Sequence, residues 1–294
     1  MDTPCRSSAA SSVVAEVRLG KLMAEGRVLF RKGCFTELVA SLPDPGHFSA
    51  PLFPARNLAT AAYVRRLATF YGAWDKLDYP SAASHSMFGP APPGAGDWAK
   101  LAPTSETVAW VRTLATQEPL DSKRRIQHMR DLLVDLLACG ERRLAQRDFS
   151  AVVQMGYAVL EKIVRVRLLL RDLEGISGLE DGLCSLERLR DPLARPLRDL
   201  RLRIFRRRNL LVTNHGTKTV GTGDQEMLAD GYRFLERQVI ADGGDEVQRS
   251  LWVARAPQRV VEKLPPDRRE ARVTFINRTA CHGSTPRKIE CFLN

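Results

Sequence analysis

Apolar residues recur at helical spacing along most of this chain. In residues 11–30 the apolar positions on or near one stripe are Val14, Val17, Leu22, Val28 and Leu29. This spacing predicts an amphipathic helix, for which Ser11 or Ser12 can serve as the N-cap. Gly33 is expected to end it, and a short helix is expected at 34–42 before the turn-forming sequence PDPG.

The following stretch repeats the scheme. A long helix is expected from residue 55 through Trp74, then a turn near 78–80 and another short helix. Two helical hairpins in series are typical of helical-repeat packing, in which each pair buries its apolar face on the next. Trp74 and Tyr79 are expected to be core aromatics rather than base-stacking platforms.

Residues 88–104 differ from both hairpins because they are rich in Pro, Gly and Ala. Such a sequence does not sustain a helix, so we expect a linker or a long surface loop there. Two strongly amphipathic segments follow, at 121–146 and 148–173, with Asp148 as the cap of the second. Two long helices with a short connection should pack antiparallel. His128 is expected on the polar face of the first.

The last part of the pattern is again helical. A shorter helix is expected around 179–190, another leads to the sequence FRRRNLLVTNHG at 205–216, and a final one is expected at 225–241. No strand alternation precedes residue 246. The sequence therefore predicts an all-α protein with a helical-hairpin domain at 12–104, a helical bundle at 105–245 and a poorly structured tail at 246–294.

Composition and charge narrow the class of protein. The chain has 294 residues, of which 44% are hydrophobic and 27% charged, as in globular proteins that bury a core. The net charge is +11 and the sequence pI is about 9.7. Such a surplus favours a polyanionic partner, most simply nucleic acid, although an arginine-rich composition throughout the source proteome would give the same surplus.

The cysteines and the N-terminal sequence indicate the cellular compartment in which the protein is expected. The six cysteines lie far apart without a C-x-x-C pair, which argues against a disulfide framework and a zinc site. Glu16 and Arg18 interrupt any signal-peptide core, and no run reaches the roughly 18 apolar residues of a membrane span. We expect a cytoplasmic protein without membrane contact, metal or cofactor.

The segment at 205–216 carries the candidate chemistry. Arg208 and His215 have six residues between them, Asn209 directly follows the arginine, and Gly216 directly follows the histidine. On a continuous helix, seven residues make about two turns, so Arg208 and His215 would project from nearly the same face. Both could then point at one phosphate.

That combination suits metal-free RNA cleavage, in which a 2′-hydroxyl attacks the adjacent phosphorus. His215 could move a proton as base or acid, and Arg208 could stabilise charge on the phosphoryl oxygens. Asn209 could hold the histidine or the phosphate. One arginine and one histidine make half of the usual acid–base set, which suggests that a second copy faces the first. Nearby basic residues are candidates for RNA binding: Arg206, Arg207 and Lys218.

The sequence RNLLVTNHG resembles the signature of HEPN ribonucleases, specifically the HEPN part of the CARF–HEPN effectors of type III CRISPR systems. That family often carries R-N-x-S-x-L-A-H-G; this chain keeps the arginine, asparagine, histidine and glycine but has Leu211 and Thr213 in the Ser–Leu region. Residues 147–169 are similar to the family's helix with an aromatic-x-x-x-Glu core. Residues 70–82 are similar to its helical hairpin with Trp-Asp. The likeness covers roughly residues 14 to 242.

The resemblance implies a HEPN bundle preceded by a helical linker domain. It also implies a homodimer whose composite site uses Arg208, Asn209 and His215 of both chains, and which cuts single-stranded RNA to 2′,3′-cyclic phosphate and 5′-hydroxyl ends in antiviral defence. The family's CARF sensor has no counterpart here, so cyclic oligoadenylate is not expected to bind this chain. Two alternatives stay open: a HEPN toxin of a toxin–antitoxin pair, and a non-catalytic helical module that binds RNA or protein.

Overall fold

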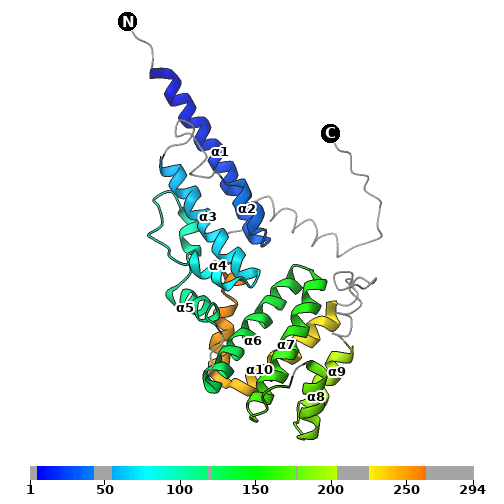
Figure 1. Cartoon of the computed structure of the whole chain (residues 1–294). Helices are drawn as coiled ribbons and strands as arrows, with labels where there is room; N and C mark the ends of the chain where they lie inside the picture. The colour runs from blue at the N-terminus through cyan, green and yellow to red at the C-terminus, as the bar shows by residue number, and fades with distance from the viewer. Residues whose placement is uncertain (1–4, 43–54, 118–120, 177, 204–224, 263–294) are drawn as a thin grey trace, which may run out of the picture.

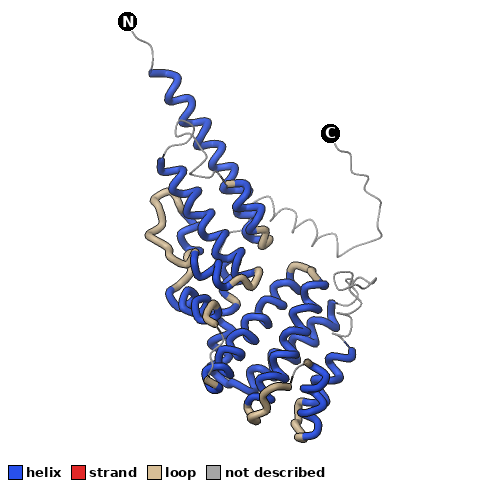
Figure 2. Tube along the Cα trace, viewed as in Figure 1, coloured by secondary structure: helices blue, strands red, loops and turns tan. Residues whose placement is uncertain are grey.

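The computed structural model describes residues 5–42, 55–117, 121–176, 178–203 and 225–262. Throughout these ranges the regular structure is helical and no strand occurs, as Figure 2 shows. The expectation of an all-α fold is therefore confirmed.

The first part of the chain forms two helical hairpins (Figure 1). They consist of α1 (Cys5–Arg31), α2 (Phe35–Ser41), α3 (Ala55–Asp75) and α4 (Tyr79–Ser84). Gly33 adopts φ +71° directly after α1, a left-handed conformation that glycine reaches without steric cost. Asp78 caps α4 by accepting a hydrogen bond from the backbone N–H of Ser81 at 3.2 Å. The local signals in the sequence thus place these helix ends correctly, as expected of caps.

An aromatic core joins the two hairpins. The ring of Phe30 lies edge-on to those of Phe35, Tyr71 and Trp98, with centroids 5.0, 5.8 and 5.6 Å apart. Edge-to-face pairs of this kind add stabilisation beyond the area that they bury. We call the buried residues around these rings, together with Trp74 and Tyr79, the first core.

The expected linker at 88–104 is not a linker in the structure. It contains the 3-10 helix η1 (Gly96–Leu101), and Trp98 and Leu101 are almost fully buried in the first core. The carbonyl of Leu101 accepts a hydrogen bond from the buried Tyr71 hydroxyl at 2.9 Å. The prediction of a linker was wrong because two apolar side chains hold a Pro- and Gly-rich segment in place through tertiary packing. The alternative, a surface loop, describes residues 88–95, which form no helix.

The remaining helices are α5 (Ser105–Leu114), α6 (Ser122–Ala145), α7 (Phe149–Leu169), α8 (Leu179–Arg188), α9 (Ala194–Arg203), α10 (Gln225–Ala254) and α11 (Ala256–Glu262). Helices α6 to α10 form a bundle. The long helices α6 and α7 lie side by side and run in opposite directions, as expected (Figure 1). Asp148 caps α7 by accepting from the N–H of Ala151 at 3.1 Å.

A second core lies among helices α6 to α10. Its buried side chains include Leu137, Val152, Leu160, Leu183, Leu197 and Leu235. His128, expected on the polar face of α6, is instead only 7% exposed. The apolar pattern alone did not indicate how completely neighbouring helices cover α6.

The C-terminal boundary also differs from the prediction. A kink at Gly244, with φ 60° and ψ −144°, interrupts α10, but the helix resumes and buries Val247 and Leu251 in the second core. Helix α11 then returns to the first core with Ala256 and Val260. The expected poorly structured tail is therefore wrong for residues 246–262, and 263–294 lie outside the described residues. Helix α5, assigned from sequence to the second unit, contributes Val111 to the first core.

Candidate functional site

The residues that carry the predicted chemistry all lie in 204–224, outside the described residues. They are the candidate catalytic residues Arg208, Asn209 and His215 and the candidate RNA-binding residues Arg206, Arg207 and Lys218. What the structure describes is the framework on either side of this segment, formed by α9 before it and α10 after it.

Both flanking helices are anchored in the second core. Leu197 of α9 and Leu228 of α10 are fully buried there. The Tyr232 hydroxyl, one turn further along α10, donates a hydrogen bond to the carbonyl of Val152 in the first turn of α7 at 2.8 Å. Burial raises the pKa of Tyr232 well above its ordinary value, so it stays a neutral donor. The helices on either side of the segment at 204–224 are thus both packed in the second core, and α10 is bonded to the first turn of α7.

Two arginines of α9, Arg198 and Arg201, form ion pairs within the chain. Arg198 binds Glu187 of α8 at 2.8 Å and also pairs with Glu180, and Arg201 binds Glu180 at 2.6 Å. These ion pairs fix α9 against α8. They also neutralise two cations that precede the predicted motif in sequence.

A buried carboxylate, which sequence analysis missed, joins the hairpins to the bundle. Asp135 of α6 is fully buried and accepts hydrogen bonds from Trp74 Nε1 and the Tyr79 hydroxyl, both at 2.9 Å, and from Trp110 Nε1 at 3.4 Å. Burial raises the pKa of Asp135, an effect opposed by Arg142 and by these three donors. We call Asp135 and its three donors the Asp135 junction.

A second buried charge lies beside that junction. The carboxylate of Asp75 forms ion pairs with Arg142 Nε at 3.1 Å and with Arg143 Nη2 at 2.6 Å. Arg142 Nη1 also donates a hydrogen bond to the carbonyl of Ala254 at 3.2 Å. Trp74 and Asp75, the Trp-Asp pair at the end of α3 in the second hairpin, therefore both bind α6. One signal in the sequence could have indicated this: Asp131, Asp135 and Arg142 interrupt the apolar stripe of α6 at spacings of four and seven, which lie on one helix face.

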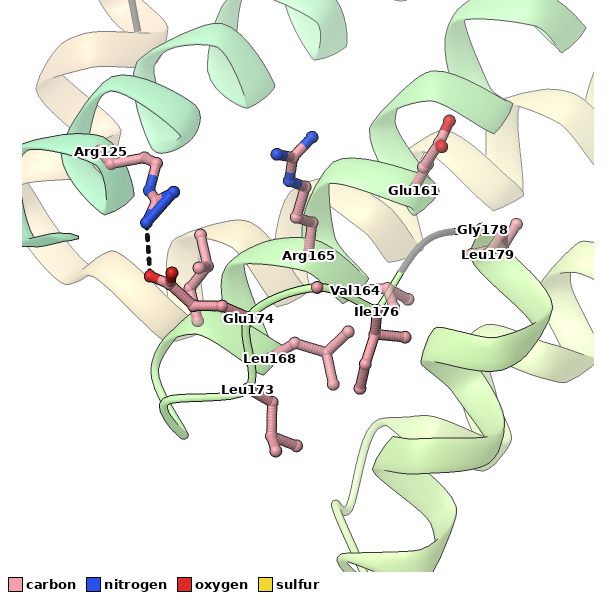
Figure 3. Close-up of a pocket in the computed structure, with 12 residues that line it drawn as sticks. Arg125, Glu161, Val164, Arg165, Leu168, Leu173, Glu174, Ile176, Gly178 and Leu179 are labelled. Carbon is pink, nitrogen blue, oxygen red and sulfur yellow. Dashed lines mark hydrogen bonds and ion pairs between the residues drawn. The ribbon is translucent and has the colours of Figure 1, made fainter. Parts of the chain in front are cut away.

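A separate cavity of about 380 Å³ lies at the other end of α7 (Figure 3). Arg165 and Glu161 project from α7 in the same direction, whereas Leu168, Leu173 and Ile176 gather on the side of the loop before α8. Arg125 and Glu174 form an ion pair beside it. Val152 and Leu168 are 16 residues apart, or about 24 Å along a helix.

The chemistry of this cavity is that of a neutral, half-apolar recess. Its charged lining residues are Arg125, Arg165, Glu161 and Glu174, which balance. It offers no histidine, cysteine or hydroxyl nucleophile among its described lining residues. Because the Tyr232 contact lies at the start of α7, this cavity lies away from the helix ends that flank the predicted motif.

Other features of the described ranges bear on the class of site. They contain no group of three or more His, Cys, Asp or Glu side chains arranged to hold a metal ion. Cys34, Cys139 and Cys184 are free thiols. None of the helices described is both long and apolar enough to cross a membrane.

The fold defines an all-α helical protein in which a hairpin region and a bundle share buried charges. Comparison with known proteins adds no family to this description: no protein-family profile, no curated protein and no solved structure matches the chain.

Proposed function

We propose that this protein is a metal-independent endoribonuclease of the HEPN type, which cleaves single-stranded RNA as a homodimer. The observation that carries the proposal is the sequence RNLLVTNHG, with Arg208, Asn209, His215 and Gly216 at the spacing of the HEPN signature. It follows a helix that is packed into a bundle built around two long antiparallel helices. By the same resemblance we propose a role in CRISPR-type antiviral defence.

In the proposed reaction the RNA supplies its own nucleophile. The 2′-oxygen bonds to the adjacent phosphorus as its proton leaves, and the bond from phosphorus to the 5′-oxygen breaks as that oxygen takes up a proton. His215 of one protomer serves as base or acid, and the second protomer supplies the complementary group. Arg208 donates to the phosphoryl oxygens, on which negative charge increases in the transition state. The products are a 2′,3′-cyclic phosphate and a 5′-hydroxyl.

The distribution of charge supports RNA as the partner. The chain carries a net charge of +11, although Arg198 and Arg201 of α9 are paired with α8. In the proposal, contact with the RNA backbone near the site is therefore made by Arg206, Arg207 and Lys218 rather than by Arg198 and Arg201. Such contacts neutralise phosphates and make binding dependent on salt.

The test is cleavage of a fluorescent single-stranded RNA in excess EDTA by the parent chain and by His215→Ala, at several protein concentrations. We expect the substitution to lower the cleavage rate by about two to four orders of magnitude, as for loss of a general acid–base group. RNA binding should stay nearly unchanged. The parent rate should rise more steeply than in proportion to protein concentration, because the active species is a dimer.

His85→Ala is the matched control, since His85 is an exposed histidine at the end of α4. It should cleave like the parent. Equal rates for His215→Ala and His85→Ala would remove His215 from the mechanism. RNA binding without cleavage by any of the three proteins would favour the non-catalytic module.

A further inference from the structure

An open groove of about 840 Å³ lies where the start of α6 meets the end of α7 and the part of α10 that follows the kink. Its lining residues are Asp121, Lys123, Arg124, Ile126, Gln127, Arg130, Leu170 and Glu246. We call it the α6 groove, because most of these residues belong to α6 or cap it. It shares no lining residue with the cavity of Figure 3.

Three cations of the groove form no ion pair with a described residue. They are Lys123, Arg124 and Arg130, and the first two are exposed. Arg125, the next residue along α6, is by contrast paired with Glu174 of the loop before α8. The groove therefore collects positive charges that the described part of the chain does not pair. Such charges favour an anionic partner.

The spacing of the cations along α6 sets the length of that partner. Lys123, Gln127 and Arg130 lie at positions i, i+4 and i+7, on one face of the helix. Lys123 and Arg130 are thus about 10 Å apart along the axis. In the polyproline II conformation, a major conformer of unfolded chains, residues three apart lie on one side at about 9 Å from each other. Carboxylates at that spacing can therefore reach both cations.

Leu170 gives the groove an apolar side. It follows α7 as the C-cap and is 49% exposed. Ile126, which also lines the groove, is partly buried against a small buried cluster of Met129, Val166 and Leu169. An apolar side chain of a partner that covers Leu170 would remove apolar surface from water and so add to the affinity.

Two features favour a peptide over a nucleic acid as the anionic partner. The described lining residues include no aromatic ring on which a base could stack. Glu246 also lines the groove and forms no ion pair with a described residue, so it would repel the uniform negative charge of a phosphodiester backbone. A peptide instead offers backbone N–H groups that can donate to this carboxylate. The other carboxylate, Asp121, already accepts the backbone N–H of Arg124 at 2.9 Å.

We propose that the α6 groove binds an acidic segment of a partner protein that carries an apolar side chain among its carboxylates. Lys123, Arg124 and Arg130 bind the carboxylates, and the apolar side chain covers Leu170. The groove uses no residue of 204–224, so the inference does not rest on the proposed ribonuclease function.

The test is fluorescence anisotropy of a labelled peptide of Glu-Glu-Leu repeats, titrated with the full chain at constant ionic strength. Arg124→Glu should weaken binding about tenfold, because it replaces an attractive charge by a repulsive one. The variant should fold, since a carboxylate is favourable in the first turn of a helix. Glu246→Gln should strengthen binding severalfold, because it removes a repulsive charge and keeps an acceptor oxygen. A merely structural disturbance would not follow the sign of the charge.

Arg195→Glu is the matched control, because Arg195 is also an exposed arginine in the first turn of its helix, α9. It makes the same change of net charge outside the groove and should bind the peptide like the parent. Two further peptides test the partner's chemistry. Gln-Gln-Leu repeats should bind at least about tenfold more weakly, since they lack the charges, and Glu-Glu-Ser repeats severalfold more weakly, since they lack the apolar contact.

The proposal is overturned if the parent shows no saturable binding of the Glu-Glu-Leu peptide, or if Arg195→Glu weakens binding as much as Arg124→Glu. It also fails if Glu246→Gln weakens binding, or if the Glu-Glu-Ser peptide binds as tightly as the Glu-Glu-Leu peptide. A labelled oligouridylate tests the other class of polyanion. If Arg124→Glu weakens its binding as much as that of the peptide, and Arg195→Glu does not, the groove is a nucleic-acid site instead.

Discussion

Asp135 and Asp191 are both buried where helices meet, but their carboxylates bind different kinds of donor. Asp135 is surrounded by neutral donors, two indole N–H groups and a phenol. Asp191, whose side chain is 0% exposed, is bound by Arg167 at 3.0 Å through both of its oxygens and also pairs with Arg171. The second arrangement, which we call the Asp191 junction, connects α7 to the loop before α9.

Because the donors are neutral at one junction and charged at the other, the two junctions should respond differently when the carboxylate is neutralised. Burial raises the pKa of Asp135, because neutral donors only partly replace the water that the carboxylate loses. At the Asp191 junction two guanidiniums would lose their shared anion if that carboxylate became neutral. A buried charge left without its partner costs far more than the net gain from the intact pair. We therefore expect the two junctions to differ sharply under the same substitution.

Asp191→Asn should have the largest effect. It leaves Arg167, whose side chain is 11% exposed, and Arg171 without their shared carboxylate, although Arg167 retains Asp242 at 2.7 Å. We expect the free energy of unfolding to fall by about 3 kcal/mol. Urea denaturation at pH 7, monitored by the helical circular dichroism signal, measures this loss.

Asp230→Asn provides the surface control for that experiment. Asp230 pairs with Arg233 on an exposed face of α10, with side chains 64% and 65% exposed. Exposed pairs contribute little, so the change should stay below about 0.5 kcal/mol. If both substitutions cost the same, the Asp191 junction does not depend on its buried anion.

Some helix boundaries were predictable from the sequence because their signals are local. The start of α1 was not, since the helix begins at Cys5 and Ser11 and Ser12, expected as its N-cap, lie inside it. Gly33 after α1 and the Asp148 cap of α7 act within a few residues, and both are confirmed. The errors arose where distant residues decide the outcome. Trp98 holds a Pro- and Gly-rich segment in the first core, and α10 continues beyond the kink at Gly244 because Val247 and Leu251 are buried in the second core.

The candidate functional residues also differ in how far apart in sequence their partners lie. The motif around Arg208 and His215 is contiguous, so residue types and spacing were enough to propose it, and it stays a prediction. The buried charges of α6 depend on partners far along the chain. Asp135 binds Trp74, 61 residues away, and Arg142 binds Ala254, 112 residues away. The spacing of Asp131, Asp135 and Arg142 places them on one face of α6, but it does not identify the distant residues that they meet.

Asp135→Asn should have a smaller effect than Asp191→Asn. An amide keeps one acceptor oxygen but turns an amino group toward one of the three donors, so about one buried hydrogen bond is lost. The free energy of unfolding should fall by about 2 kcal/mol in the same urea experiment. A loss equal to that of Asp191→Asn would indicate that Arg142 holds Asp135 as a required anion. The contrast between neutral and ionic junctions would then fail.

Asp131 is the limiting case of the comparison, a carboxylate that is 8% exposed with a single amide donor, Gln127, at 3.1 Å among the described residues. Burial raises its pKa from 3.8 to about 6, Gln127 opposes this, and Glu246 adds to it. The folded state therefore binds the proton more tightly than the unfolded state. The contribution of Asp131 to stability is favourable at low pH and is lost as the pH rises through the interval from 3.8 to about 6.

Asp131→Asn should consequently stabilise the protein above pH 7, where the parent carries a buried charge and the variant does not. The amide oxygen can still accept from Gln127. We expect a gain of about 1 kcal/mol, since solvent and the remaining hydrogen bond screen part of the charge. Melting temperatures measured from pH 3.5 to pH 8 should diverge as the pH rises from about 4 to about 6, keep a constant difference above about pH 6, and converge below about pH 4. Asp245→Asn, at an exposed position of α10, should follow the parent at every pH.

Parallel curves for Asp131→Asn would mean that Asp131 keeps its charge at no cost. One neutral donor would then stabilise a buried carboxylate as well as the three donors of the Asp135 junction do.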